Sequence, residues 1–294
     1  MSSTDRLQSL APQDYPGLFQ AADAVSVAQQ RSYLRAVRAR LVLTVAAAVF
    51  AAFELPVGGG IELYAVGTAL AFIGVMAVEL AVAGNRPDKL WYEGRALAES
   101  LKTLTWRYVA AAAPFNGERA DEEFVERIRA LQRNMPEVPP QPSTAPAISE
   151  RMRAMRSAPL AARKEAYLTF RVRDQQDWYA DKAVYHHRRA RIFWTLTLIM
   201  EVAGIAGALA KAFGLVDFDL AGIVAALVSA LAAWNSTRQH NSTATAYVLA
   251  SHELAAVRDQ LSHDLDEQEW SDAVVDAETA ISREHTMWHA NRAR

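Results

Sequence analysis

The sequence predicts an all-α membrane protein with four spanning helices, arranged as two parallel two-helix repeats with long helices that continue into a cytoplasmic bundle. Three observations predict this class: four long apolar stretches, arginine clusters at one end of each pair of stretches, and polar segments with helical spacing. No strand pattern competes with them, so the polar parts of the chain are expected to be helical as well.

The four apolar stretches occupy residues 41–57, 63–83, 192–210 and 218–234. Each approaches the ~20 residues that a helix needs to cross ~30 Å of hydrocarbon at ~1.5 Å per residue. A helix that is apolar on every face lies either in lipid or in the centre of a large core. Four such stretches with basic flanks favour lipid.

Positive charges mark the same end of both pairs. Arginines precede the first and third stretches and basic residues follow the second and fourth, whereas the two short connectors carry a single lysine. The positive-inside rule therefore predicts a multi-pass protein of the plasma membrane with both termini and the middle segment in the cytoplasm. The clusters are expected to contact membrane lipid headgroups, with a site for another anion as the alternative. Their arginines are Arg35, Arg38, Arg40, Arg188, Arg189 and Arg191.

The chain is predicted to consist of two similar units. Residues 1–24 are expected to be loose, residues 25–135 to form the first two-span unit and residues 148–294 the second. A Pro-rich linker at residues 136–147 separates them, because its five prolines exclude a helix. Both pairs start and end on the same side, so the repeats are parallel rather than inverted.

Polar helices are expected beside the spans. Residues 160–185 lack Pro and Gly and should run directly into the third span, and residues 242–265 should continue from the fourth. Residues 88–113 should follow the second span after a break near Pro87, because proline cannot continue a helix in progress. Residues 120–133 should form a short amphipathic helix.

Short motifs lie next to the predicted spans. They are RVRDQQDWY at residues 171–179, ESLK at 99–102, WRY at 106–108 and WHANR at 288–292. These motifs resemble the SLATT family of two-span bacterial membrane modules that accompany nucleotide-signalling conflict systems. The resemblance covers most of residues 25–292 and implies two SLATT units in tandem. It also implies a pore-forming or membrane-perturbing effector of bacterial defence, with a nucleotide-signalling protein as partner.

Three acids lie in or near the apolar stretches, and a carboxylate in hydrocarbon costs several kcal/mol unless it faces protein or water. Glu54 is expected to reach the outer interface, whereas Glu79 and Glu201 are candidates for lining a path. Glu201 follows Arg191 by ten residues, which places it near mid-membrane. It is predicted to line a conduit, with a hydrogen-bonded contact between helices as the alternative. Glu79 lies in the inner half of the second span, and either lines the same path or pairs with an arginine ahead of the first span.

Small residues recur every four positions along the fourth stretch, so another helix can approach its backbone closely. This pattern predicts either packing within one protomer or the lining of a narrow path. The candidate lining residues of this stretch are Ala226, Ser229, Ala230, Ala233 and, at its inner end, Asn235.

Other classes of function lack a signal. The chain has no cysteine, no glycine-rich phosphate loop and no histidine spacing typical of a metal site, so neither an enzyme nor a bound metal or cofactor is expected. A net charge of −2 argues against nucleic-acid binding. The sequence predicts an oligomeric membrane pore or ion channel, with a permeant ion and copies of itself as partners. The alternative is a non-conducting scaffold or sensor whose cytoplasmic helices recruit a partner protein.

Overall fold

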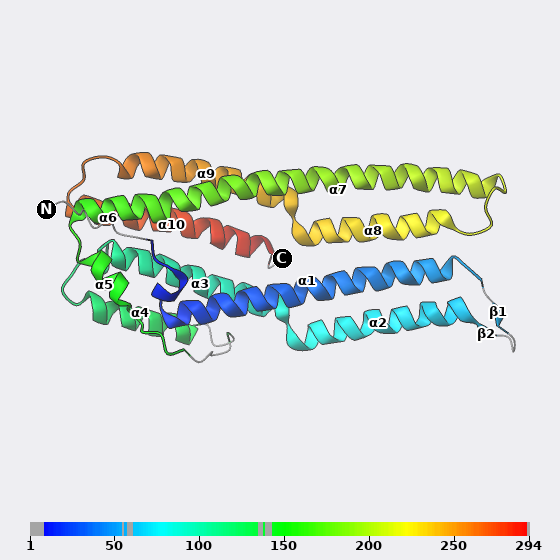
Figure 1. Ribbon diagram of the computed structural model, residues 1–294, viewed down its shortest axis with the longest axis horizontal. Helices are drawn as coiled ribbons and strands as arrows, with labels where there is room; N and C mark the ends of the chain where they lie inside the picture. Colours follow the sequence, from blue (N-terminus) through cyan, green and yellow to red (C-terminus); the bar gives the residue numbers. More distant parts are fainter. Residues whose placement is uncertain (1–8, 55, 58–60, 135–137, 139–142, 293–294) are drawn as a thin grey trace. The chain divides into compact units, whose positions relative to one another are not determined.

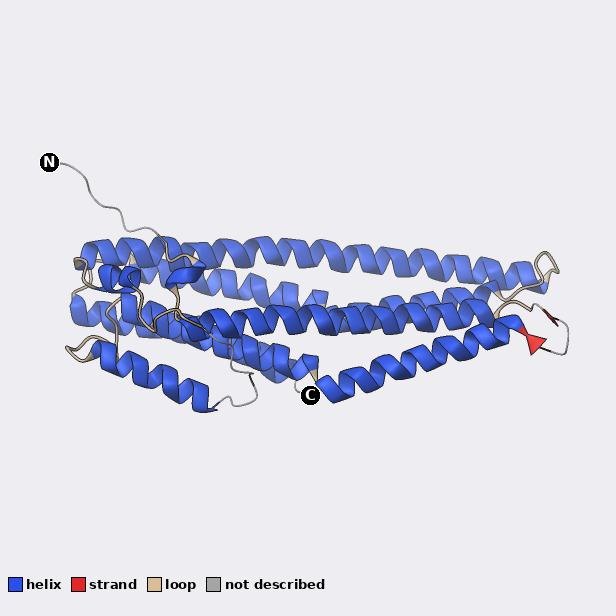
Figure 2. Ribbon diagram, turned by 60° about the horizontal axis from the view of Figure 1, so that its bottom comes forward, coloured by secondary structure: helices blue, strands red, loops and turns tan. Residues whose placement is uncertain are grey.

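The computed structural model describes residues 9–54, 56–57, 61–134, 138 and 143–292. Its described residues are overwhelmingly helical, which confirms the predicted all-α class (Figures 1 and 2). The helices are α1 (Gly17–Ala51), α2 (Leu63–Asn85), α3 (Pro87–Val109), α4 (Ala120–Asn134), α5 (Glu150–Arg156), α6 (Leu160–Tyr167), α7 (Asp174–Ala212), α8 (Leu220–Arg238), α9 (His240–Leu261) and α10 (Glu267–Arg292).

Four short elements complete the described structure. A 3₁₀ turn, η1 (Pro12–Asp14), precedes α1, and a π-helical segment, η2 (Leu168–Arg173), joins α6 to α7. Strands β1 (Pro56–Val57) and β2 (Ile61–Glu62) pair antiparallel between α1 and α2.

The chain forms two compact units. The membrane unit contains residues 30–87 and 184–244, and the head unit contains the other described residues. Helices α1 and α7 contribute residues to both units, whereas α2 and α8 belong wholly to the membrane unit. Each unit therefore draws on both halves of the sequence.

Glycines bring the helices of the membrane unit together in pairs. A Cβ atom at Gly67 would lie 3.1 Å from the Phe50 ring, which places α2 close against α1. A Cβ atom at Gly207 would lie 3.0 Å from Leu220, which places α7 equally close to α8. The absence of a side chain at these positions is what permits the close approach.

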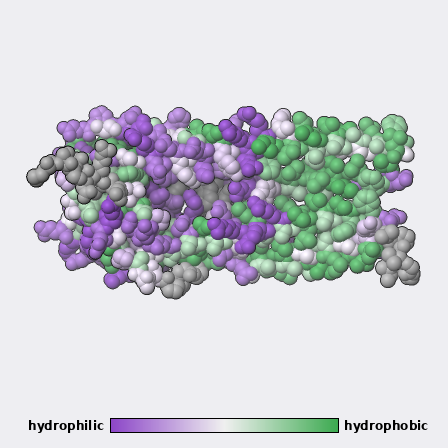
Figure 3. Space-filling view, in the orientation of Figure 1, coloured by the Kyte–Doolittle hydropathy of each residue, from purple (hydrophilic) through white to green (hydrophobic). Residues whose placement is uncertain are grey.

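The apolar helices of the membrane unit are exposed rather than buried. Three helices of the described chain, which include α2, the second half of α7 and α8, are long and apolar enough to cross a membrane, and only 6% of each apolar window is buried. Large side chains such as Leu70, Trp194 and Ile205 are more than half exposed. Figure 3 shows a broad hydrophobic surface over one end of the molecule. Because this surface is both apolar and exposed, its composition is suited to contact with lipid and not to a protein core.

The first predicted span differs from the structure. It was expected at residues 41–57, but α1 ends at Ala51, and residues 56–57 already belong to β1. The last 18 residues of α1 include Arg35, Arg38 and Arg40, which explains why α1 is not among the three spanning candidates.

Two helix breaks lie at equivalent places after α2 and α8. Arg86 and Gln239 adopt left-handed backbones, with φ of 43° and 48°, and α3 and α9 start directly behind them. The predicted break near Pro87 is therefore confirmed. The predicted continuity after the fourth span is wrong, because Gln239 interrupts it, and α9 ends at Leu261 instead of residue 265.

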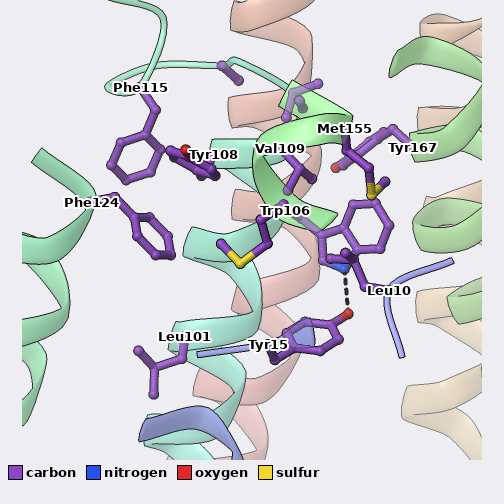
Figure 4. Close-up of a cluster of buried hydrophobic side chains, with 14 of the residues drawn as sticks. Leu10, Tyr15, Leu101, Trp106, Tyr108, Val109, Phe115, Phe124, Met155 and Tyr167 are labelled. Atoms are coloured by element: carbon purple, nitrogen blue, oxygen red, sulfur yellow. Dashed lines mark hydrogen bonds between the residues drawn. The ribbon is translucent and has the colours of Figure 1, made fainter. Parts of the chain in front are cut away.

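An aromatic core fills the head unit. Trp106, Tyr108, Phe115 and Phe124 are almost completely buried together (Figure 4). The Trp106 Nε1 donates a 3.0 Å hydrogen bond to the Tyr15 hydroxyl, which attaches the start of the chain to this core. Helix α1 begins at Gly17, so residues 17–24, which the sequence predicts to be loose, are helical.

The polar helices follow most of the predictions. The chain is continuously helical from Leu160 to Ala212, with η2 as a local π-helical segment, and α4 occupies nearly the range predicted for the amphipathic helix. Helix α5 was not predicted. No helix is present in the described part of the Pro-rich linker, at residues 138 and 143–147, and its remaining positions lie outside the described residues.

Candidate functional site in the membrane helices

Glu201 lies on the exposed surface of α7. Gly204 and Gly207 on the same helix turn toward α8, and a Cβ at Gly204 would lie 3.3 Å from Val224. The glycine face therefore makes the contact within the protomer, and the carboxylate points elsewhere. Glu201 is about 15 Å along the helix from Arg191, half of the hydrocarbon thickness. The predicted alternative was a hydrogen-bonded contact between Glu201 and another helix. No such partner is present among the described residues of one protomer.

Glu79 takes a different role within the protomer. Its Oε1 lies 3.6 Å from Nη1 of Arg40, so the acid of α2 pairs with the predicted arginine cluster of α1. Both side chains are exposed, and the pair therefore contributes little stability on its own. This geometry matches the pairing alternative, while lining of a path by Glu79 stays a prediction.

The small residues of α8 lie on two faces. Ser229 is exposed together with Ala225 and Ala232, at i, i+4 and i+7 spacing, which gives one small-residue face open to the outside of the protomer. Ala226 and Ala233 are half-buried. The predicted lining residues of α8 therefore do not share one surface.

Ala230 belongs to a groove between α8 and α1. The groove has a volume of about 400 Å³ and is lined from α1 by Arg38 and apolar residues. The apolar lining residues of both helices are Leu41, Val42, Val45, Leu227, Ala230, Leu231 and Trp234. Directly after the groove residue Trp234, the Oδ1 atom of Asn235 is buried and has no hydrogen-bond partner among the described residues.

The predicted arginine clusters are organised by aromatic rings. The Arg38 guanidinium lies 4.9 Å from the centre of the Trp234 ring, and Arg238 lies 6.0 Å from the same ring. On α7, Arg189 lies over Tyr185 at 5.4 Å. Cations over aromatic faces are attracted by the ring quadrupole. Trp234 was not predicted as a site residue, although a tryptophan at the end of a span is the usual signal of a membrane interface.

The other arginines of the predicted clusters either make local contacts or are exposed. Nε of Arg35 donates to the Arg31 carbonyl at 3.3 Å, Nη2 of Arg191 lies 3.3 Å from the His187 ring, and Arg188 is exposed. The partners in these contacts are a backbone carbonyl and a histidine ring, so neither contact pairs a guanidinium group with a carboxylate.

A pair of histidines also joins α7 to α9. The Nδ1 atoms of His186 and His240 are 2.9 Å apart, so one ring donates to the other, and Phe193 stacks on His240 at 5.7 Å. His240 was not singled out by the sequence. Among the described residues, no group of three potential ligands gathers for a metal ion.

The residues that carry the family resemblance serve the core of the head unit. Arg171 donates two hydrogen bonds to the Glu278 carboxylate, at 2.8 and 2.7 Å, and the Tyr167 hydroxyl donates to it at 2.9 Å. Both members of this ion pair are buried. Glu278 was missed by the sequence reasoning, although it interrupts the apolar face of α10 between Val274 and Ile281.

Burial and hydrogen bonding also shift two acidic groups of the head unit. Burial raises the pKa of Tyr15 to about 12. A 2.6 Å hydrogen bond from the Tyr108 hydroxyl holds the pKa of Asp121 below its usual value, and contacts with Arg153 lower this pKa further. These groups order the core, and none of them forms an arrangement typical of catalysis.

Comparison with known families assigns both halves of the chain. Residues 16–164 match the family model described as "SMODS and SLOG-associating 2TM effector domain 3", and residues 167–288 match "SMODS and SLOG-associating 2TM effector domain 1". The chain belongs to the SLATT family. It contains two SLATT domains in tandem, as the motifs predicted, and SLATT membership implies a membrane effector. No curated protein and no solved structure matches this SLATT protein.

Proposed function

We propose that this SLATT protein is an effector of a bacterial defence or stress response that acts as an oligomeric, ion-conducting pore in the plasma membrane. In this proposal both termini and the head unit are cytoplasmic. A nucleotide-signalling protein supplies the trigger, in keeping with the family description. The membrane unit forms the conducting part, and no cofactor or catalytic step is needed.

The observation that carries the proposal is the exposure of Glu201 on α7. A lone protomer in lipid would present this carboxylate to hydrocarbon near mid-membrane, at a cost of several kcal/mol. The neighbouring glycines already contact α8, so rotation of α7 within the protomer cannot hide the acid without loss of that contact. A second protomer or a water-filled path is the remaining way to satisfy it.

The small-residue face of α8 supports an assembly of several copies. Ala225, Ser229 and Ala232 are exposed, and such a face allows a helix of a neighbouring protomer to approach closely. Four helices in one chain leave no room for a central path between them. A closed ring of copies places the path on its symmetry axis instead.

A fourth span is supported by the connectivity of the head unit. Tyr15 precedes α1, Trp106 follows α2, and their side chains share a hydrogen bond. The two residues therefore lie on one side of the membrane, and the chain between them crosses it an even number of times. Since α2 has the length and composition of a span, this connectivity supports a second crossing in α1.

Conductance of the purified protein in planar bilayers tests the pore directly. Glu201→Gln removes the charge at nearly constant volume, and we expect the cation-over-anion permeability ratio to fall by about tenfold, which is ~1.4 kcal/mol. Glu54→Gln serves as the matched control, because this exposed acid lies beyond the end of α1. Its permeability ratio should stay close to that of the unmodified protein.

The copy number is measured on the same preparation by native mass spectrometry. A complex of three or more copies that conducts supports the proposal. A monomer without conductance over a range of lipids and voltages would overturn it and favour the non-conducting scaffold. Unchanged selectivity in Glu201→Gln would remove this residue from the path.

A further inference from the structure

The groove between α1 and α8 has the chemistry of a phospholipid site. We propose that it binds one acyl chain of an anionic phospholipid, whose phosphate is held by Arg38 at the inner end. This inference depends on the membrane location of the unit but not on ion conduction. It names one binding site, whereas the predicted arginine clusters describe a general attraction to the membrane surface.

The walls of the groove fit a hydrocarbon chain. Val42 and Val45 face Leu227 and Leu231 across it, and the volume of about 400 Å³ lies within the usual range of ligand sites. Residues 38 to 45 extend ~10 Å along α1, so the groove accommodates the part of an acyl chain that lies nearest the headgroup. Among the described residues that line it, Arg38 alone is charged.

The charged end of the groove is suited to a phosphate. Arg38 is exposed, and no carboxylate among the described residues pairs with it. Arg35 and Arg31 lie three and seven residues before Arg38 on the same face of α1, in register with Val42 and Val45. Both are exposed as well. Arg40, which points away by about half a turn, is instead paired with Glu79.

Trp234 completes the inner end of the groove. Its ring lines the groove and holds the Arg38 guanidinium at 4.9 Å, which fixes the cation at the level where the apolar part of α8 ends. Tryptophan prefers the depth of the lipid headgroups. Basic pockets between spanning helices on the cytoplasmic side are suited to anionic headgroups. Charge and depth thus select an anionic phospholipid over a zwitterionic one.

A quenching experiment on reconstituted protein tests the site. The chain has no cysteine, so Val45→Cys accepts a single fluorophore in the groove, and Val202→Cys provides the control label on the exposed face of α7. The probes are phosphatidylglycerol and phosphatidylcholine with identical brominated chains. We expect the Val45→Cys label to be quenched at a several-fold lower fraction of phosphatidylglycerol than of phosphatidylcholine. The Val202→Cys label should show no preference.

Charge variants then identify the headgroup contact. Arg38→Gln in the Val45→Cys background should abolish the preference for phosphatidylglycerol, Arg38→Lys should retain part of it, and Arg188→Gln, the matched variant on α7, should retain all of it. Equal quenching by both lipids in the unmodified background would overturn the proposal. So would oxidative disulfide crosslinking of unlabelled Val45→Cys between two copies, because a neighbouring protomer would then occupy the groove.

Discussion

Arg171 and Glu278 form the most deeply buried ion pair in the described part of the chain. Two hydrogen bonds join the guanidinium and the carboxylate, and Tyr167 donates a third. Removal of two charges from water is expensive, and such a pair is stabilising only while both members are present. The pair links η2 to α10, so it holds the last helix against the rest of the head unit.

We expect Glu278→Gln to destabilise the head unit by about 3–5 kcal/mol, because the Arg171 charge then remains buried without a counterion. Chemical unfolding of the purified protein in detergent, followed by tryptophan fluorescence, measures this change. Trp270 and Trp106 lie in the same core and report on it. Asp276→Asn, an exposed acid on the same helix, should cost less than ~0.5 kcal/mol. Equal stability of both variants would show that the pair does not hold α10.

The sequence predicts single residues well where their chemistry conflicts with their surroundings. Glu201 stands out because it is an acid among apolar residues, and Glu79 because it lies within reach of arginines. Trp234 and His240 were missed because an aromatic or histidine side chain at a helix end has many ordinary roles. Their significance depends on which side chain approaches from another helix, and local periodicity does not contain that information.

At the scale of helices, the breaks behind α2 and α8 are the clearest correspondence between the two halves. Arg86 and Gln239 both adopt left-handed backbones, and each donates its N–H to the carbonyl four residues earlier, at 2.8 Å. Pro87 predicts the first break, because proline cannot continue a helix in progress. The second break has no proline or glycine, so the sequence predicted a continuous helix there.

The left-handed backbone at Gln239 costs ~1–2 kcal/mol for any residue with a Cβ atom. Gln239→Gly and Gln239→Ala both remove the side chain, but only glycine removes this cost. We therefore expect Gln239→Gly to be more stable than Gln239→Ala by about 1 kcal/mol in unfolding of the detergent-solubilised protein. Glycine and alanine variants at Ser236, inside α8, should show the reverse order. A more stable Gln239→Ala would indicate that α8 and α9 form one continuous helix.

At the scale of the whole molecule, topology is the property that a simple measurement decides. Introduced cysteines report their side of the membrane through an impermeant thiol reagent, since the native chain has none. With four spans, Gln13→Cys and Glu253→Cys react only after permeabilisation of the cells, and Leu215→Cys reacts in intact cells. If α1 does not cross, Gln13→Cys and Glu253→Cys should react on opposite sides of the membrane.

The class and the tandem domains followed from the sequence because long apolar stretches and short motifs are local properties. The composition of each unit did not. The head unit combines the described residues up to 29, the segment between the two pairs of spans, and the chain from Thr245, which contains most of α9 and α10. These segments are brought together by the aromatic and ionic contacts of Tyr15, Trp106 and Glu278, which join residues far apart in the chain.

The arginines in the second half of α1 also bear on how the protein is made. After Arg40, only eleven residues of this helix remain, and the last of them is Ala51. A ribosome-bound chain that had exposed α1 alone would offer the translocon a poor segment, because arginine near the centre of a segment costs ~2.5–3.5 kcal/mol. Helix α2 carries the pairing partner of Arg40 and the glycines that receive Phe50 and Leu43. Biogenesis should therefore insert α1 and α2 together as a hairpin, and partition of the first helix into the bilayer waits until the second has been synthesised.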